Sequence, residues 1–106
     1  MKIYKLDSMT KGWFVGDFES AFRTKDCEVA VKKYKAGDFE AKHLHKIATE
    51  VTAILSGSVL MNDKEYGEGD IIVMEPGEAT DFKAITDVVN VVVKVPSVVG
   101  DKYATD

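Results

Sequence analysis

The sequence contains few of the residues that mark covalent cross-links or flexible linkers. Its single cysteine, Cys27, excludes an intrachain disulfide and any metal site built from paired cysteines. We expect Cys27 to be a small buried residue on a strand rather than a reactive thiol. Only two prolines occur, and no stretch combines many glycines, serines and prolines, so no linker divides the chain. Residues 1–106 are therefore expected to form one domain.

Long apolar runs and concentrated positive charge are also absent. No segment approaches the length of a membrane-spanning helix, and the first residues lack the apolar core of a signal peptide. We therefore expect a cytoplasmic protein with no membrane partner. The formal net charge is −4 and the basic residues are scattered, so no basic stripe exists to neutralise a nucleic-acid backbone. Nucleic acid is not an expected partner.

The residues that are present predict an all-β domain. Hydrophobic residues make up 45% and charged residues 30% of the chain, as in an ordinary globular protein. Short runs of Val, Ile, Thr and aromatic residues are separated by Gly, Asp and Asn, as in a sandwich or barrel. The last run is apolar on both faces, which favours a central position, and Pro96 should end it. The pattern predicts a tight turn at Asn62-Asp63 and strands near 2–6, 12–16, 27–35, 41–45, 51–56, 58–61, 71–74, 79–84 and 88–95.

Both histidines of the chain lie close together, as His43 and His45. Side chains two residues apart on a strand point to the same face, so both imidazoles project one way. Glu50 follows a short turn and can return on the adjacent strand, facing the same cavity. Two imidazoles and one carboxylate suit a divalent first-row metal ion and leave positions open for substrate, water or dioxygen. A plainer interpretation is two satisfied or exposed histidines and a surface carboxylate.

Strand alternation also predicts the surroundings of these three residues. It places a mostly apolar set on the inner face, forming a pocket suited to a small organic molecule. The alternative is that each of these side chains belongs to a plain hydrophobic core and does not contact a ligand. The residues of this expected pocket are Val31, Thr52, Ile54, Met61 and Phe82.

The stretch that contains the histidines resembles the first sequence motif of the cupins. That motif is a glycine, five residues, His-x-His, three or four residues, a glutamate, six residues and a glycine. The five fixed positions are matched at this spacing by Gly37, His43, His45, Glu50 and Gly57. The resemblance implies a single-domain cupin jelly-roll β-barrel, with the first motif at 37–57. Cupins commonly pair through their sheets, so it also implies a homodimer.

A second stretch, 69–77, resembles the start of the second cupin motif, whose region here extends to about residue 84. The family's fourth metal ligand is a histidine, and this sequence has Thr80 at that position. We expect Thr80 to face the cavity and to hydrogen-bond a metal-bound water or a substrate. Asp81 should alternate outward, unless a β-bulge turns it inward as a replacement ligand.

Three hypotheses for the function follow from these residues. Three ligands suffice to hold a metal, so the first is a metal-dependent enzyme acting on a small metabolite with Fe, Ni, Mn or Zn. The reaction would be of dioxygenase, isomerase or decarboxylase type, although no catalytic acid or base stands out besides the ligands. The second is a non-catalytic small-molecule binding or sensor module, with or without metal. The third is a structural role with a vestigial site.

Overall fold

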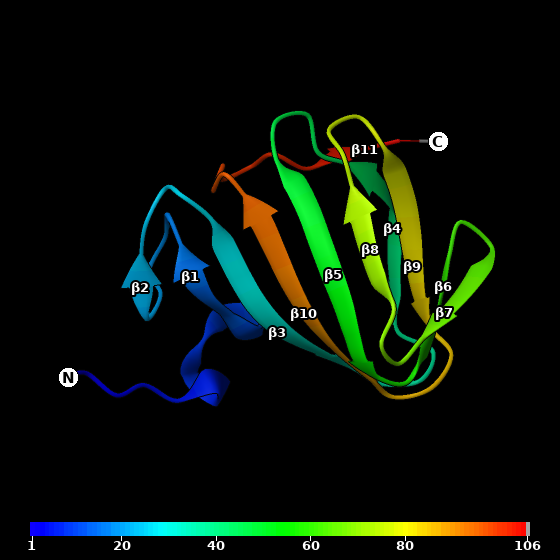
Figure 1. Ribbon diagram of the computed structural model, residues 1–106, viewed down its shortest axis with the longest axis horizontal. Helices are drawn as coiled ribbons and strands as arrows, with labels where there is room; N and C mark the ends of the chain where they lie inside the picture. The colour runs from blue at the N-terminus through cyan, green and yellow to red at the C-terminus, as the bar shows by residue number, and fades with distance from the viewer. Residues whose placement is uncertain (106) are drawn as a thin grey trace.

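Two facing β-sheets make up most of the structure, a computed structural model that describes residues 1–105 (Figure 1). One sheet has six strands in the order β2-β1-β3-β10-β5-β8, and the other has five in the order β11-β4-β9-β6-β7. All pairs are antiparallel except β1 with β2. The strands are β1 (Trp13–Gly16), β2 (Phe22–Arg23), β3 (Glu28–Tyr34), β4 (Phe39–Leu44), β5 (Thr49–Ser56), β6 (Ser58–Met61), β7 (Lys64–Gly67), β8 (Ile71–Met74), β9 (Ala79–Ala84), β10 (Val88–Val95) and β11 (Tyr103–Ala104).

The position of β10 confirms the prediction for the long apolar run. It lies in the middle of the six-stranded sheet and pairs with β3 on one side and β5 on the other. Both faces are covered along most of its length, which is why valine is tolerated at successive positions. The strand ends at Val95, because Pro96 has no N–H to continue the ladder.

Two turns show how the sequence sets the strand pairing. Asn62 and Asp63 have φ of 50° and 63°, the left-handed conformation of a tight hairpin, and join β6 to β7 as predicted. Gly57 joins β5 to β6 with a φ of 93°. A Cβ at Gly57 would also collide with the carbonyl oxygen of Asp87, so both the conformation and the space require glycine.

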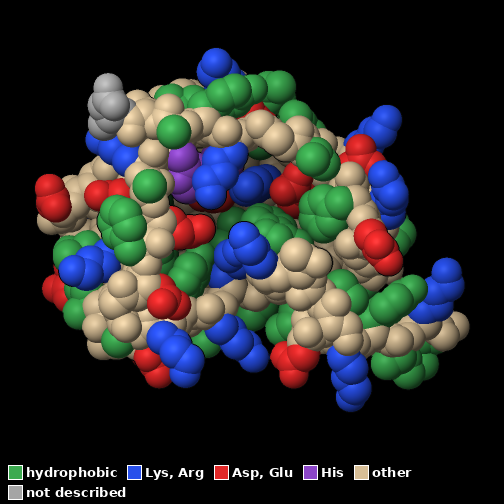
Figure 2. Space-filling model, turned by 180° about the vertical axis from the view of Figure 1, so that it is seen from behind, with side chains coloured by type: hydrophobic (Ala, Val, Ile, Leu, Met, Phe, Trp, Pro, Cys, Tyr) green, Lys and Arg blue, Asp and Glu red, His purple; other side chains and the backbone are tan. Residues whose placement is uncertain are grey.

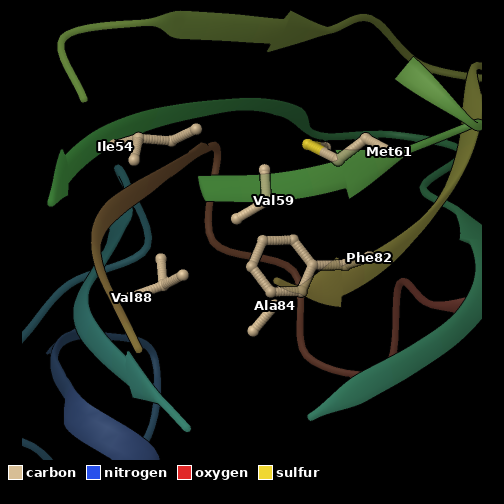
Figure 3. Close-up of a cluster of buried hydrophobic side chains, with 6 residues drawn as sticks. All are labelled: Ile54, Val59, Met61, Phe82, Ala84 and Val88. Carbon is tan, nitrogen blue, oxygen red and sulfur yellow. The ribbon is translucent and has the colours of Figure 1, made fainter. Parts of the chain in front are cut away.

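A cluster of buried side chains fills part of the space between the sheets (Figure 3). The phenyl ring of Phe82 lies at its centre, and Tyr34 packs against it with ring centroids 4.5 Å apart. The cluster draws on both sheets, so it fixes their separation and thereby the width of the space beside it. Its members are Ile54, Val59, Met61, Phe82, Ala84 and Val88.

The predicted first strand, at 2–6, is wrong. Residues 1–5 have no regular structure, and two 3₁₀ turns, η1 (Leu6–Ser8) and η2 (Thr10–Gly12), follow them. Ile3 stays exposed, since β propensity alone does not make a strand where no partner strand is available. The two-residue strands β2 and β11 were not predicted, because they are too short to show alternation. Within residues 1–105, no helix has the length and apolar character needed to cross a membrane.

Candidate metal centre

The three predicted ligands lie where the chain passes from one sheet to the other. His43 is on β4 of the five-stranded sheet, and His45 follows the end of that strand. Glu50 is on β5 of the six-stranded sheet, paired with Met74 on one side and Lys94 on the other. The turn between His45 and Glu50 therefore places imidazoles and carboxylate on facing walls.

Backbone carbonyl groups fix the tautomer of both imidazoles. The Nδ1–H of His45 donates to the carbonyl oxygen of Asp101, and that of His43 donates to the carbonyl oxygen of Ala41 at 3.0 Å. A carbonyl oxygen only accepts, so the proton of each neutral ring is on Nδ1. Nε2 of each ring is left with a free lone pair, the arrangement found in histidines that ligate a metal through Nε2.

His45 and Glu50 face each other without a hydrogen bond. Nε2 of His45 lies 3.5 Å from Oε1 of Glu50, and this buried nitrogen has no hydrogen-bond partner. In the neutral ring, two acceptors would oppose each other at this contact, and either a metal ion or a proton between them relieves this. The Glu50 carboxylate raises the pKa of His45 in spite of burial. Burial opposes ionisation of Glu50, but His45 and Lys94 outweigh it and lower its pKa.

His43 supplies a third ligand of the right type, but the three side chains do not converge on one point. Its ring centroid lies 5.4 Å from that of His45, with the two planes at 80°. As the side chains lie, no three His, Cys, Asp or Glu groups among residues 1–105 converge closely enough to hold an ion. The donors thus fit a divalent metal by their chemistry and by the orphaned nitrogen of His45. A closed coordination sphere therefore requires a shift among the side chains of His43, His45 and Glu50.

Asp101 was missed by the sequence analysis, although it holds the turn between the ligands. Its carboxylate is buried and accepts backbone N–H groups of Lys46 at 2.9 Å, Ile47 at 3.1 Å and Ala48 at 2.9 Å. Burial alone would raise the pKa of Asp101, but these three hydrogen bonds outweigh it and hold this pKa below its usual range. A lone Asp more than fifty positions after the histidines carries no recognisable sequence signal.

A cavity of about 250 Å³ lies between the sheets next to these residues and opens on the face shown in Figure 2. His43, Glu50 and Thr52 contribute to its wall, while Met61 and Phe82 join it to the core. Ile54 does not reach the cavity, contrary to expectation, because it is enclosed in the core cluster. The remaining lining residues are Lys11, Trp13, Phe18, Glu28, Lys32, Tyr34, Glu40, Thr80, Asp81, Val92, Lys94 and Lys102.

This wall is charged, and the expectation of a mostly apolar pocket is wrong. On β3 the residues that face the cavity alternate in the opposite phase to the predicted one, and further charged residues come from other segments. Glu28, Lys32 and Tyr34 face the cavity, whereas Val31 lies on the other face near Leu6. Residues of the N-terminal segment lie over part of that outer face, so Val31 is half-buried there, away from the cavity.

Thr80 lies across from His43 in the pairing of β4 with β9, is buried, and lines the cavity. Its hydroxyl donates to the Asp81 carbonyl at 2.7 Å. Asp81 also contributes to the cavity wall, between Thr80 and Phe82, which are the buried residues of this part of β9, and the β4–β9 register shifts nearby, between Glu40 and His43. The Asp81 carboxylate accepts the backbone N–H of Asn62 at 2.7 Å and joins no ligand cluster.

Comparison with known proteins identifies the fold. Neither a family model nor a curated protein matches the sequence. A conserved double-stranded β-helix protein from Klebsiella pneumoniae aligns with a TM-score of 0.74 at 20% identity, covering 99% of this chain and 93% of its own. An RmlC-like cupin from Shewanella frigidimarina aligns with a TM-score of 0.65 at 15% identity, and the alignment covers 70% of this chain and 69% of that protein. The Bacillus subtilis oxalate decarboxylase, which has Mn(II) centres, aligns with a TM-score of 0.66 at 16% identity. This alignment covers 76% of this chain and 24% of the decarboxylase chain. The chain has the cupin fold.

Proposed function

We propose that the protein binds one divalent transition-metal ion through His43, His45 and Glu50 and acts with it on a small organic metabolite. The metal would be Fe, Ni, Mn or Zn, and the reaction of dioxygenase, isomerase or decarboxylase type. One observation carries the proposal: the buried Nε2 of His45 has no partner and faces a carboxylate oxygen at 3.5 Å. The Mn(II) centres of oxalate decarboxylase, which has the same fold, support it.

The remaining residues bind and orient rather than react. A bound ion would polarise a substrate oxygen or activate dioxygen. The Thr80 hydroxyl already donates its proton to a backbone carbonyl, so its oxygen is free to accept a hydrogen bond from substrate or water. Met61 and Phe82 close the cavity toward the core and keep water from that side. The Tyr34 hydroxyl donates to Glu40 at 3.1 Å, which fixes its orientation in the wall.

A metal-free binding or sensor module is the second candidate. Thr80 stands where cupins carry a fourth ligand, so the site has at most three strong donors. A proton on His45 would also resolve the contact between its Nε2 and Glu50, as an ion pair. The cavity would then hold its ligand without turnover.

Elemental analysis of protein purified without a metal-affinity tag separates these candidates. We expect about one divalent ion per chain, lost in His45→Ala and Glu50→Gln, because removing one of three ligands nearly abolishes retention. The control is Glu65→Gln, an exposed carboxylate on β7, which should keep the ion. Uptake should also fall as the pH drops through the imidazole range, since protonated histidine does not ligate. Protein that is metal-free and fails to take up added Fe, Ni, Mn or Zn would contradict the proposal.

A further inference from the structure

Four lysines from four separate segments line the cavity. Lys11 is in η2, Lys32 on β3, Lys94 on β10, and Lys102 just before β11. Figure 2 shows basic side chains around the hollow on this face, close to a histidine. The protein as a whole carries a net charge of −4, so composition alone does not account for four ammonium groups at one cavity.

The carboxylates of the same wall already have partners. Glu28 accepts the Ser97 hydroxyl at 2.9 Å, and Glu40 accepts the Tyr34 hydroxyl at 3.1 Å. Asp81 is held by a backbone N–H, and Glu50 faces His45. In contrast, no ion pair within residues 1–105 joins any of the four lysines to a carboxylate. The four carboxylates thus balance the charge of the wall, but among residues 1–105 the ammonium groups are the charged groups of this wall that have no hydrogen-bond or ion-pair partner.

Trp13 gathers two of these cations at one place. The Nζ atoms of Lys32 and Lys94 lie 5.4 Å and 4.9 Å from the centre of its ring, within the range of cation–π attraction. Lys32 on β3 pairs with Asn90 on β10, and Lys94 lies four residues further along β10, so the two lysine side chains project from the same face of the sheet. Burial lowers the pKa of Lys32, and Lys11, Lys94 and Lys102 add to this against the opposing effect of Glu40. An anion at this point would relieve the repulsion among the ammonium groups.

We propose that the cavity takes a small carboxylate-bearing metabolite, whose carboxylate binds Lys32 and Lys94 beside Trp13. This inference rests on the proposed role of the cavity as a small-molecule site, and it does not require the metal. The volume of about 250 Å³ is below the roughly 300–1,000 Å³ of common ligand pockets, so the ligand is small. Most of the wall is built of strands whose backbone N–H groups are paired in the sheets, and these strands offer no backbone nest of the kind that commonly holds phosphate.

Trp13 is the only tryptophan, so its fluorescence reports directly on this wall. Chelator-treated protein is titrated with malonate, with its neutral counterpart malonamide, and with inorganic phosphate at constant ionic strength. We expect a saturable change with malonate and none with malonamide, with phosphate binding much more weakly. Absence of a saturable change with malonate, or an equal response to malonamide or phosphate, would overturn the inference.

Substitutions locate the binding groups. Lys32→Met and Lys94→Met should each weaken malonate binding about tenfold or more, because each removes a charge-assisted hydrogen bond. The matched control is Lys33→Met, an exposed neighbour on β3 outside this wall, which should bind malonate as the wild type does. Equal losses in the control and in Lys32→Met would overturn the assignment. Lys32→Arg should recover most of the affinity for malonate. If a variant fails to fold, the comparison of malonate with malonamide on the wild-type protein still tests the inference.

The metal and the anion proposals fail separately in this design. His45→Ala should lose metal and keep malonate binding in chelator-treated protein. Lys32→Met should keep metal and lose malonate binding. Metal uptake without malonate binding in the wild type contradicts only the anion inference, whereas malonate binding without metal uptake contradicts only the proposed metal site.

Discussion

Replacing Asp101 with Asn should destabilise the protein and weaken metal retention at the same time. The Asp101 carboxylate uses one oxygen for the Lys46 N–H and the other for the N–H groups of Ile47 and Ala48. Asn keeps a single acceptor oxygen. Its best orientation retains the Ile47 and Ala48 bonds and sets the amide NH₂ against the Lys46 N–H.

The magnitude follows from the three hydrogen bonds. A bond to a charged group contributes about 1.5–3 kcal/mol and a neutral one about 0.5–1.5 kcal/mol. One bond is lost outright and two lose their charge assistance, and because the three share one acceptor group the losses do not add fully. We expect a loss of about 3 kcal/mol in the free energy of unfolding.

Urea denaturation followed by circular dichroism measures this loss. With a typical slope, about 3 kcal/mol lowers the midpoint by roughly 1–3 M urea. The control is Asp26→Asn, an exposed aspartate whose carboxylate accepts no such set of bonds, and it should leave the midpoint unchanged. A change below about 1 kcal/mol in Asp101→Asn, or undiminished metal retention, would refute the role given to this carboxylate.

Further predictions concern other parts of the structure. Thr80→His should tighten metal binding in a calorimetric titration, since it supplies the ligand that cupins carry there; unchanged affinity would mean that this position does not face the metal. Gly57→Ala should lower the free energy of unfolding by about 2 kcal/mol or more, and by more than Gly69→Ala, whose Cβ would meet nothing within 4 Å. Stability should decline below about pH 4, because the lowered pKa of Asp101 stabilises the fold only while the group is ionised, and Asp101→Asn should flatten this decline. Sedimentation should show a homodimer that Val73→Lys disrupts, since Val73 is exposed on the apolar outer face of β8; a monomeric wild type would contradict this.

Most of the fold was predictable because its signals are local. The bounds of β6, β8, β9 and β10 agree with the predicted strands, since alternation and turn residues mark both ends. The Asn62-Asp63 hairpin was predictable from residues that tolerate positive φ. The spacing of Gly37, the ligands and Gly57 predicted the cupin jelly roll, and the structural comparisons agree with it.

The parts of the site that depend on long-range contacts were not predictable. The Asp101 carbonyl that orients His45, and the carboxylate that holds the turn, come from a segment with no motif. The part of the charged wall that lies on β3 was missed because the phase of this strand depends on what covers its outer face. Only the folded chain shows that the N-terminal segment provides that cover and leaves Lys32 facing inward.

We propose that a metal ion, and not a proton, lies between the lone pair of His45 Nε2 and Glu50. An anomalous difference map tests it directly, recorded at the metal absorption edge on crystals grown with added Mn²⁺ or Zn²⁺. We predict one peak within about 2.0–2.3 Å of Nε2 of His45, Nε2 of His43 and a Glu50 oxygen. Density without a peak there, with His45 and Glu50 joined by a direct hydrogen bond, would contradict it.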